Sequence, residues 1–226
     1  ITAVLISINW LLYVLSIAHG HVIDASLGYF INPLLNVVLG VVLLRERLTV
    51  AQWVSVAVAA TGVLWLTFNY GSFPWIALSL AASFGFYGFI RKLAVVDSIA
   101  GLAIESLYLF LPALVWMETQ GSGGFTSTWS WQVNALLVFA GVLTALPLIG
   151  FSYAVRRVPY SVIGFMQYIA PTLQLLIGVL VFHEVFDRDR AIGFIFIWIG
   201  LAIFAIDGFW RSRNQPASGP VADRLD

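Results

Sequence analysis

One carboxylate, Glu105, lies inside a long apolar stretch and is the clearest candidate for chemistry. It comes seven residues after Ser98, where that stretch begins, which is about 10 Å along a helix. A charged side chain inside a hydrocarbon layer costs free energy, so such residues usually serve a function. Glu105 is therefore predicted to couple protons or to meet a cationic solute. The alternative is a carboxylate that packs helices together or reaches towards the membrane surface.

Two prolines, Pro33 and Pro171, each lie in an apolar stretch and are flanked by polar side chains at the same offsets. A polar residue stands four positions before each proline and another three positions after it; these are Tyr29, Asn36, Gln167 and Gln174. Such offsets place the polar groups on the face of a helix that carries the proline. Proline also frees a backbone carbonyl one turn earlier. Both prolines are predicted hinges beside a pathway, with simple packing kinks as the alternative.

Further polar and aromatic residues extend this candidate site. Asn9, Tyr13 and Ser16 follow one another at helical spacing on the first apolar segment. A cavity for aromatic or amide-bearing solutes is predicted, and its lining is Asn9, Trp10, Tyr13, Tyr29, Asn32, Asn36, Gln167, Tyr168 and Gln174. The alternative for each of these residues is hydrogen bonding between helices. No catalytic residue, metal site or cofactor is predicted, since the chain has no cysteine and no HExxH, GxSxG or phosphate-binding glycine motif.

The composition defines the elements that carry these residues. Of 226 residues, 61% are hydrophobic and 10% are charged, and the mean hydropathy is +0.95. Soluble domains carry roughly a quarter charged residues. The chain is therefore predicted to be an all-α integral membrane protein, because it has solid apolar blocks rather than the alternation of a membrane β-barrel. The same composition excludes a disordered chain, a nucleic-acid binder and a disulfide scaffold.

Eight apolar segments are predicted to cross the membrane. They are residues 2–18, 23–44, 50–68, 73–90, 98–117, 131–155, 161–182 and 190–210. Nine of the eleven basic residues, Arg91 and Lys92 among them as anchors, fall on one side of these spans, which predicts that this side is cytoplasmic. Residues 211–226 are polar and are predicted to form a disordered cytoplasmic tail. Both ends of the chain are then expected to face the cytoplasm.

The chain also contains an internal repeat. At an offset of 138 residues four pairs coincide, namely Pro33 with Pro171, Gly40 with Gly178, Glu46 with Glu184, and Gly62 with Gly200. The two proline segments are five spans apart, so the copies are predicted to have inverted topology, as in many secondary transporters. The second copy, residues 73–210, has five spans and the first, residues 1–69, has three. Two more helices are therefore expected before Ile1, which makes the visible spans helices three to ten of a ten-helix protein.

The repeated glutamates end their helices near opposite membrane faces. Glu46 is expected to cap its own turn or to pair locally with Arg45 or Arg47, and Glu184 is expected to do the same with its neighbouring arginines. This interpretation makes them parts of a shared structural turn. The alternative is an ion pair that latches a gate.

Four stretches of the sequence resemble the RarD branch of the drug/metabolite transporter superfamily, which is built from two EamA repeats. They are NWLLYVLSIAHGHVIDASLGYFINPLLNVVLGVVLLRERL at 9–48, FGFYGFIRK at 84–92, IES at 104–106 and IAPTLQLLIGV at 169–179. The resemblance implies ten helices, a location in the bacterial inner membrane and export of small molecules. It also places a glutamate in the motif that holds Glu105. RarD-type proteins take their name from chloramphenicol sensitivity.

Together these features predict a secondary active transporter of small organic solutes, such as chloramphenicol or amphipathic metabolites, that works by alternating access of inverted repeats. The expected partners are a small-molecule substrate, the lipid bilayer and protons as the coupling ion, with no nucleic acid, and the protein is expected to be a monomer or a homodimer. One alternative is a non-transporting membrane subunit or sensor. An intramembrane enzyme is less favoured, because three histidines near segment ends and no cysteine offer no tight catalytic cluster.

Overall fold

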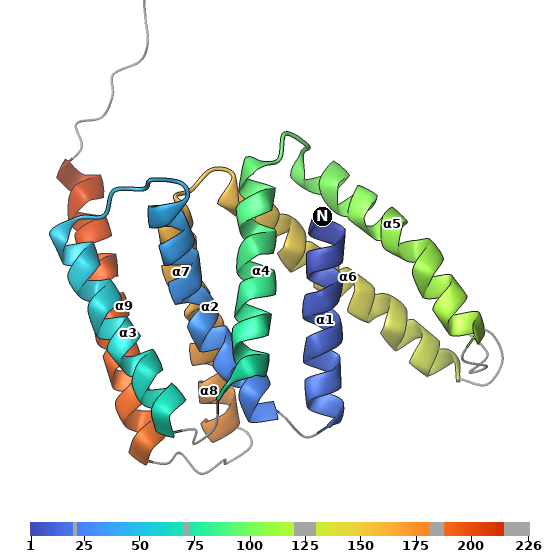
Figure 1. Ribbon diagram of the computed structural model, residues 1–226, viewed down its shortest axis with the longest axis horizontal. Helices are drawn as coiled ribbons and strands as arrows, with labels where there is room; N and C mark the ends of the chain where they lie inside the picture. Colours follow the sequence, from blue (N-terminus) through green and yellow to red (C-terminus); the bar gives the residue numbers. More distant parts are fainter. Residues whose placement is uncertain (20–21, 70–72, 120–129, 181–187, 215–226) are drawn as a thin grey trace, which may run out of the picture. The chain divides into compact units, whose positions relative to one another are not determined.

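The computed structural model describes residues 1–19, 22–69, 73–119, 130–180 and 188–214 (Figure 1). These residues form nine helices and no strand. The helices are α1 (Thr2–Ala18), α2 (Val22–Val42), α3 (Val50–Asn69), α4 (Trp75–Leu93), α5 (Ser98–Thr119), α6 (Trp131–Val155), α7 (Tyr160–Gln167), α8 (Ile169–Leu180) and α9 (Arg188–Asn214).

Most of these helices are long and apolar. Within the described residues, five are long and apolar enough to cross a membrane, at Val50–Asn69, Trp75–Leu93, Ser98–Val115, Trp131–Val155 and Ala191–Arg211. Thr2–Ala18 and Leu27–Val42 form shorter apolar helices. A helix satisfies its own backbone hydrogen bonds, so apolar runs of this length can sit in hydrocarbon. The predicted all-α fold built from apolar helices is confirmed.

One predicted span is interrupted in the structure. The segment predicted at 161–182 contains two helices, α7 and α8, which are separated at Tyr168. The break precedes Pro171, which has no N–H to donate to the Gln167 carbonyl, and the Tyr168 N–H donates to the Phe165 carbonyl at 3.2 Å. Its counterpart Pro33 does not interrupt α2.

The last helix is longer than expected. α9 continues to Asn214, so the first four residues of the predicted disordered tail are helical. Residues 215–226 lie outside the described residues. Arg211 explains part of the extension, because its Nε lies 3.2 Å from Asp207 Oδ2, one turn earlier on the same helix.

The chain divides into two compact units. The first comprises residues 1–46 and 73–171, and the second comprises residues 47–72 and 172–226. In the first unit, α2 packs against α4 and α7, and α4 also packs against α1; Figure 1 shows α1, α4 and α2 side by side. The buried residues Leu39, Val155, Tyr160 and Ile163 form a core where α2, α6 and α7 meet. This unit holds most of the predicted site residues.

In the second unit, α3 and α9 lie side by side (Figure 1) and are packed closely at glycines. A Cβ atom added to Gly62 would lie 2.6 Å from the Gly193 carbonyl oxygen, and one added to Gly200 would lie 2.8 Å from the Ser55 carbonyl oxygen. The order of these contacts is opposite along the two helices, so α3 and α9 are antiparallel. The small residues let the backbones approach each other, as is common between membrane helices.

Candidate functional site

Three carboxamide side chains meet where α2 packs against α7. Asn32 and Asn36 of α2 both donate from Nδ2 to Oε1 of Gln167 on α7, Asn32 at 3.4 Å. Gly164 permits this approach, because a Cβ atom there would lie 2.5 Å from the Pro33 carbonyl oxygen. Asn36 is fully buried and Asn32 is 8% exposed. We call Asn32, Asn36 and Gln167 the carboxamide cluster.

Two oxygens of the carboxamide cluster have no protein donor. Asn32 Oδ1 and Asn36 Oδ1 are buried and have no hydrogen-bond partner among the described residues. A buried carbonyl without a partner costs roughly 1–3 kcal/mol, so such groups are normally satisfied by protein, water or ligand. The carboxamide cluster can therefore accept hydrogen bonds from N–H or O–H groups of a solute.

An aromatic row leads from α1 to α2. The Trp10 and Tyr13 rings meet edge to face with centroids 6.3 Å apart, and the Tyr13 and Tyr29 rings do so at 6.0 Å. Tyr29 lies three residues before Asn32, on the same face of α2. Trp10 and Tyr29 remain partly exposed, at 44% and 41%. These rings can contact an aromatic solute beside the carboxamide cluster.

Two other predicted lining residues, Asn9 and Tyr168, belong neither to the carboxamide cluster nor to the aromatic row. The Asn9 amide faces α4, where its Nδ2 donates to the Leu80 carbonyl and to Ser83 Oγ, both at 2.9 Å. Tyr168 is fully buried at the break between α7 and α8, and its ring lies 6.3 Å from that of Phe165. Gln174 belongs to α8, but its side chain lies outside the described part of the structure. Their role in solute binding stays a prediction, as does the hinge role of Pro33 and Pro171.

Glu105 is paired with a second buried charge. Its Oε1 lies 3.7 Å from Nη1 of Arg91 on α4, and the two side chains are only 5% and 3% exposed. The Tyr87 hydroxyl donates to Glu105 Oε2 at 3.3 Å. Such a pair ties α5 to α4, which supports the packing alternative for this carboxylate. Proton coupling by Glu105 stays a prediction.

Arg91 joins three helices and its side chain is only 3% exposed, while its role as a positive-inside anchor stays a prediction. Its Nε donates to Ser152 Oγ of α6 at 2.8 Å, and its Nη2 donates to the Ser98 carbonyl of α5 at 2.9 Å. A Cβ atom added to Gly101 would run into the guanidinium group. We call Tyr87, Arg91, Ser98, Glu105 and Ser152 the ionic cluster.

A sequence signal for the ionic cluster existed. Ser98, Gly101 and Glu105 are spaced i, i+3 and i+7, which places a hydroxyl, a gap and a carboxylate on one face of a helix. Tyr87 and Arg91 are spaced i and i+4 on the preceding helix. Matching the two faces would have indicated that Arg91 points inwards.

Glu46 also differs from expectation. Its carboxylate accepts hydrogen bonds from the backbone N–H groups of Tyr160 and Ser161 on α7 and lies 4.0 Å from Lys92 Nζ. The predicted pairing with Arg45 or Arg47 is therefore wrong. A local turn is present at this point, because the Glu46 N–H donates to the Gly40 carbonyl at 3.0 Å. Glu184 lies outside the described residues.

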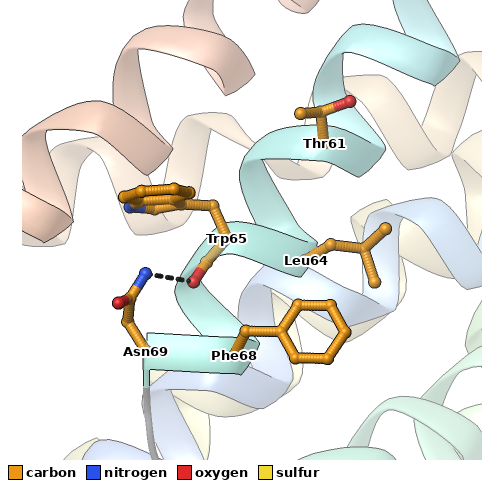
Figure 2. Close-up of a pocket in the computed structure, with 5 residues that line it drawn as sticks. All are labelled: Thr61, Leu64, Trp65, Phe68 and Asn69. Carbon is orange, nitrogen blue, oxygen red and sulfur yellow. Dashed lines mark hydrogen bonds between the residues drawn. The ribbon is translucent and has the colours of Figure 1, made fainter.

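A surface hollow of about 430 Å³ lies on α3, in the second unit. Figure 2 shows its lining, which is Thr61, Leu64, Trp65, Phe68 and Asn69. All five residues come from one helix, and the Asn69 amide already donates to the Trp65 carbonyl at 2.9 Å. No predicted site residue lines this hollow, so we do not take it as the functional site.

Comparison with known proteins identifies the class. Residues 1–68 and 73–206 match the sequence model described as the EamA-like transporter family, and the chain belongs to that family. It is a multi-pass membrane protein of the RarD type. Protein RarD of Streptomyces exfoliatus is 44% identical over 96% of this chain and 70% of that protein.

Two further similarities concern a more distant relative and the fold. A Pseudomonas aeruginosa relative with the name Chloramphenicol-sensitive protein RarD is 30% identical over 97% of this chain and 73% of that protein. A solved structure entitled "Crystal structure of protein" has a TM-score of 0.64 and 21% identity, and covers 88% of this chain and 73% of that chain. At that identity the solved structure shows the fold alone.

Proposed function

We propose that the protein is a secondary active transporter that moves small organic solutes across the bacterial inner membrane by alternating access. The observation that carries this proposal is the carboxamide cluster. It places unpaired buried acceptors between α2 and α7, two helices that lie at or next to the repeated prolines, in a protein of a transporter family. Buried polar groups within the apolar helices of a membrane protein usually mark a solute pathway.

Reciprocal contacts between α3 and α9 support the inverted repeat. Gly62 packs on Gly193, and Gly200 packs on Ser55. The offset of 138 residues converts the first contact into the second, and it also converts the contact of Gly62 with Ile197 into that of Gly200 with Ala59. Contacts exchanged in this way are expected across a two-fold axis. Since α3 and α9 are antiparallel, we propose inverted repeats at residues 1–69 and 73–210 of a ten-helix protein.

The chemistry of the site favours solutes that carry hydrogen-bond donors and an aromatic ring. Asn32 Oδ1 and Asn36 Oδ1 accept N–H or O–H groups, and the aromatic row of Trp10, Tyr13 and Tyr29 accommodates a ring. Chloramphenicol has an aromatic ring, an amide and hydroxyl groups, and the name of the P. aeruginosa relative links that protein to it. Chloramphenicol is therefore the first solute to test.

Glu105 is the proposed proton-coupling residue, and the side rich in basic residues is the proposed cytoplasmic side. The Arg91 guanidinium is the counter-charge of this carboxylate, with 3.7 Å between Nη1 and Oε1, so a coupling role would require the ionic cluster to rearrange. A coupling role can therefore be tested with Glu105→Gln, which removes the carboxylate charge and keeps the size of the side chain.

Accumulation of chloramphenicol tests the proposal. Cells that express the protein are compared with empty-vector cells, with Glu105→Gln, and with Asp97→Asn as a matched control that removes an exposed carboxylate, 67% exposed, near the same end of α5. We expect lower accumulation that Glu105→Gln and a proton uncoupler both abolish and that Asp97→Asn preserves, at equal amounts of folded protein. Unchanged accumulation with chloramphenicol and with a panel of aromatic amides and amines would contradict the transport of such solutes.

A further inference from the structure

Glu46 follows the end of α2, yet its carboxylate caps a helix that begins 114 residues later. It accepts hydrogen bonds from the N–H groups of Tyr160 and Ser161, the latter at 2.9 Å, and from the Ser161 hydroxyl at 2.7 Å. The first N–H groups of a helix have no partner within the helix, and they favour negative charge. Glu46 thereby holds the C-terminal end of α2 to the N-terminal end of α7.

Lys92 extends this connection to α4 and α6. Its Nζ donates to the carbonyl oxygens of Val155 and Val158, at 2.9 and 2.7 Å, where α6 ends. The same Nζ lies 4.0 Å from Glu46 Oε1, and the Lys92 and Glu46 side chains are only 19% and 14% exposed. A cation at the C-terminal end of one helix and an anion at the N-terminal end of the next complement both helix dipoles. We call Glu46, Lys92 and Ser161 the latch.

The local backbone is shaped to deliver Glu46 to the latch. Arg45 has φ of 56°, a left-handed conformation that is unfavourable for a residue with a Cβ atom. This turn lets the Glu46 N–H donate to the Gly40 carbonyl at 3.0 Å. The carboxylate passes directly over Gly40, where an added Cβ atom would lie 2.7 Å from Glu46 Oε2. The hydrogen bonds of the latch therefore offset the unfavourable left-handed conformation of Arg45. When these bonds are lost, the turn is expected to open.

The latch lies at one end of the helix pair that carries the carboxamide cluster. Between the two, Val37 of α2 is 2% exposed and fills the contact with Gly164 of α7. We propose that the latch closes α2 against α7 on the side rich in basic residues. It must open for a solute to reach the carboxamide cluster from that side. This inference rests on the proposed transport function, and it makes Glu46 a positioning residue of the pathway.

A cysteine introduced at a buried position between the latch and the carboxamide cluster can report on this closure, because it reacts only when the helices separate. The chain contains no cysteine of its own, so all labelling comes from the introduced residue. Val37→Cys is introduced alone, and a membrane-impermeant thiol reagent is added to right-side-out or inside-out membrane vesicles. We expect slow labelling with an intact latch and labelling about tenfold faster in Glu46→Gln, because a charged hydrogen-bond acceptor is lost. The increase is expected only from the basic side. Lys92→Gln should act less strongly and Ser161→Ala least, since the backbone N–H contacts remain.

Asp97→Asn, which breaks an exposed ion pair with Arg156 near the same membrane face, is the matched control and should leave labelling unchanged. Equal labelling in Glu46→Gln and the parent, or a rise of equal size from both sides, would overturn the latch and leave Glu46 a stabilising cap. If Glu46→Gln does not yield folded protein, Ser161→Ala gives the same test with a smaller change. Labelling needs no solute, so the latch and the transport function can fail separately.

Discussion

The first unit contains two buried polar clusters, one built around an ion pair and one built from neutral carboxamide groups. In the ionic cluster, the Arg91 guanidinium has three partners and the Glu105 carboxylate has two. In the carboxamide cluster, no group is charged, and two amide oxygens have no partner among the described residues. A charge must be paired to stay buried, whereas a neutral amide can remain unpaired at a smaller cost.

This difference indicates that the ionic cluster connects helices, whereas the carboxamide cluster is suited to bind a solute. The ionic cluster pairs its two charges and ties α4, α5 and α6 to one another, although Glu105 Oε1 and Ser98 Oγ have no hydrogen-bond partner among the described residues. The carboxamide cluster has two amide oxygens without a partner among the described residues, so a solute or water can donate hydrogen bonds to them. Substitutions in the ionic cluster should therefore change stability first, and substitutions in the carboxamide cluster should change transport first.

Removal of Arg91 should have the largest effect. Arg91→Leu leaves the Glu105 carboxylate buried without its counter-charge, and loss of one partner from a buried pair costs about 3–5 kcal/mol. The double variant Arg91→Leu with Glu105→Leu removes both charges and should recover most of that loss. Unfolding free energies in mixed micelles give the double-mutant cycle. Additive losses in the double variant would argue against a coupled pair.

A methyl group at Gly101 should disturb the same cluster without removing any of its charges. Gly101→Ala pushes on the Arg91 guanidinium and is expected to cost about 1–3 kcal/mol, as for other overpacked sites. Gly208→Ala is the control, because an added Cβ atom there meets nothing within 4 Å, and alanine favours helix. Thermal unfolding of the two variants should separate clearly. Equal melting temperatures would show that Arg91 can move aside.

The carboxamide cluster should respond in transport rather than in stability. Asn36→Leu removes a buried oxygen that has no partner, and it also removes the Nδ2 donor to Gln167 Oε1, for which Asn32 Nδ2 remains as a donor. The unfolding free energy should therefore fall by only about 1 kcal/mol. Solute flux should fall about tenfold, which corresponds to one lost hydrogen bond. Asn9→Leu should show the reverse pattern, because the Asn9 amide donates to Leu80 and Ser83. Flux that is unaffected by Asn36→Leu would remove this residue from the site.

Loss of an exposed ion pair is expected to have the smallest effect on stability. Asp97 pairs with Arg156 at 3.6 Å, and the Asp97 side chain is 67% exposed. Surface pairs contribute about 0–1 kcal/mol because water and salt screen them. Asp97→Asn should therefore change the melting temperature very little, and added salt should reduce even that difference. A large loss would mean that Asp97 acts through contacts other than this ion pair.

Several features of the site followed from the sequence and others did not. Glu105 was marked by its depth in an apolar helix, and Asn36 and Gln167 by their spacing around the repeated prolines, whereas Asn32 was only one of the proposed lining residues. The break at Tyr168 could not be predicted, because Pro33 at the equivalent position leaves α2 unbroken. A proline removes a donor in both cases, and the packing of neighbouring helices decides whether the helix is interrupted.

Charge counts along the sequence predicted sidedness but not depth. Arg91 and Lys92 are adjacent, yet Arg91 is buried in the ionic cluster and Lys92 belongs to the latch. The positive-inside pattern counts basic residues and carries no information on where each side chain points. The partner of Glu46 lies on a helix that begins more than a hundred residues away, so local sequence could not identify it.

The sequence by itself determined the all-α fold and its long apolar helices, and it predicted the repeat at an offset of 138 residues. Runs of about 20 apolar residues have few solutions in hydrocarbon, because every backbone group must be paired within its own helix. Only the tertiary structure decided which polar groups meet. The pairing of Arg91 with Glu105, of Glu46 with α7 and of Asn36 with Gln167 depends on the rotation and register of packed helices. Hydropathy does not encode these quantities, because many registers bury the same apolar area.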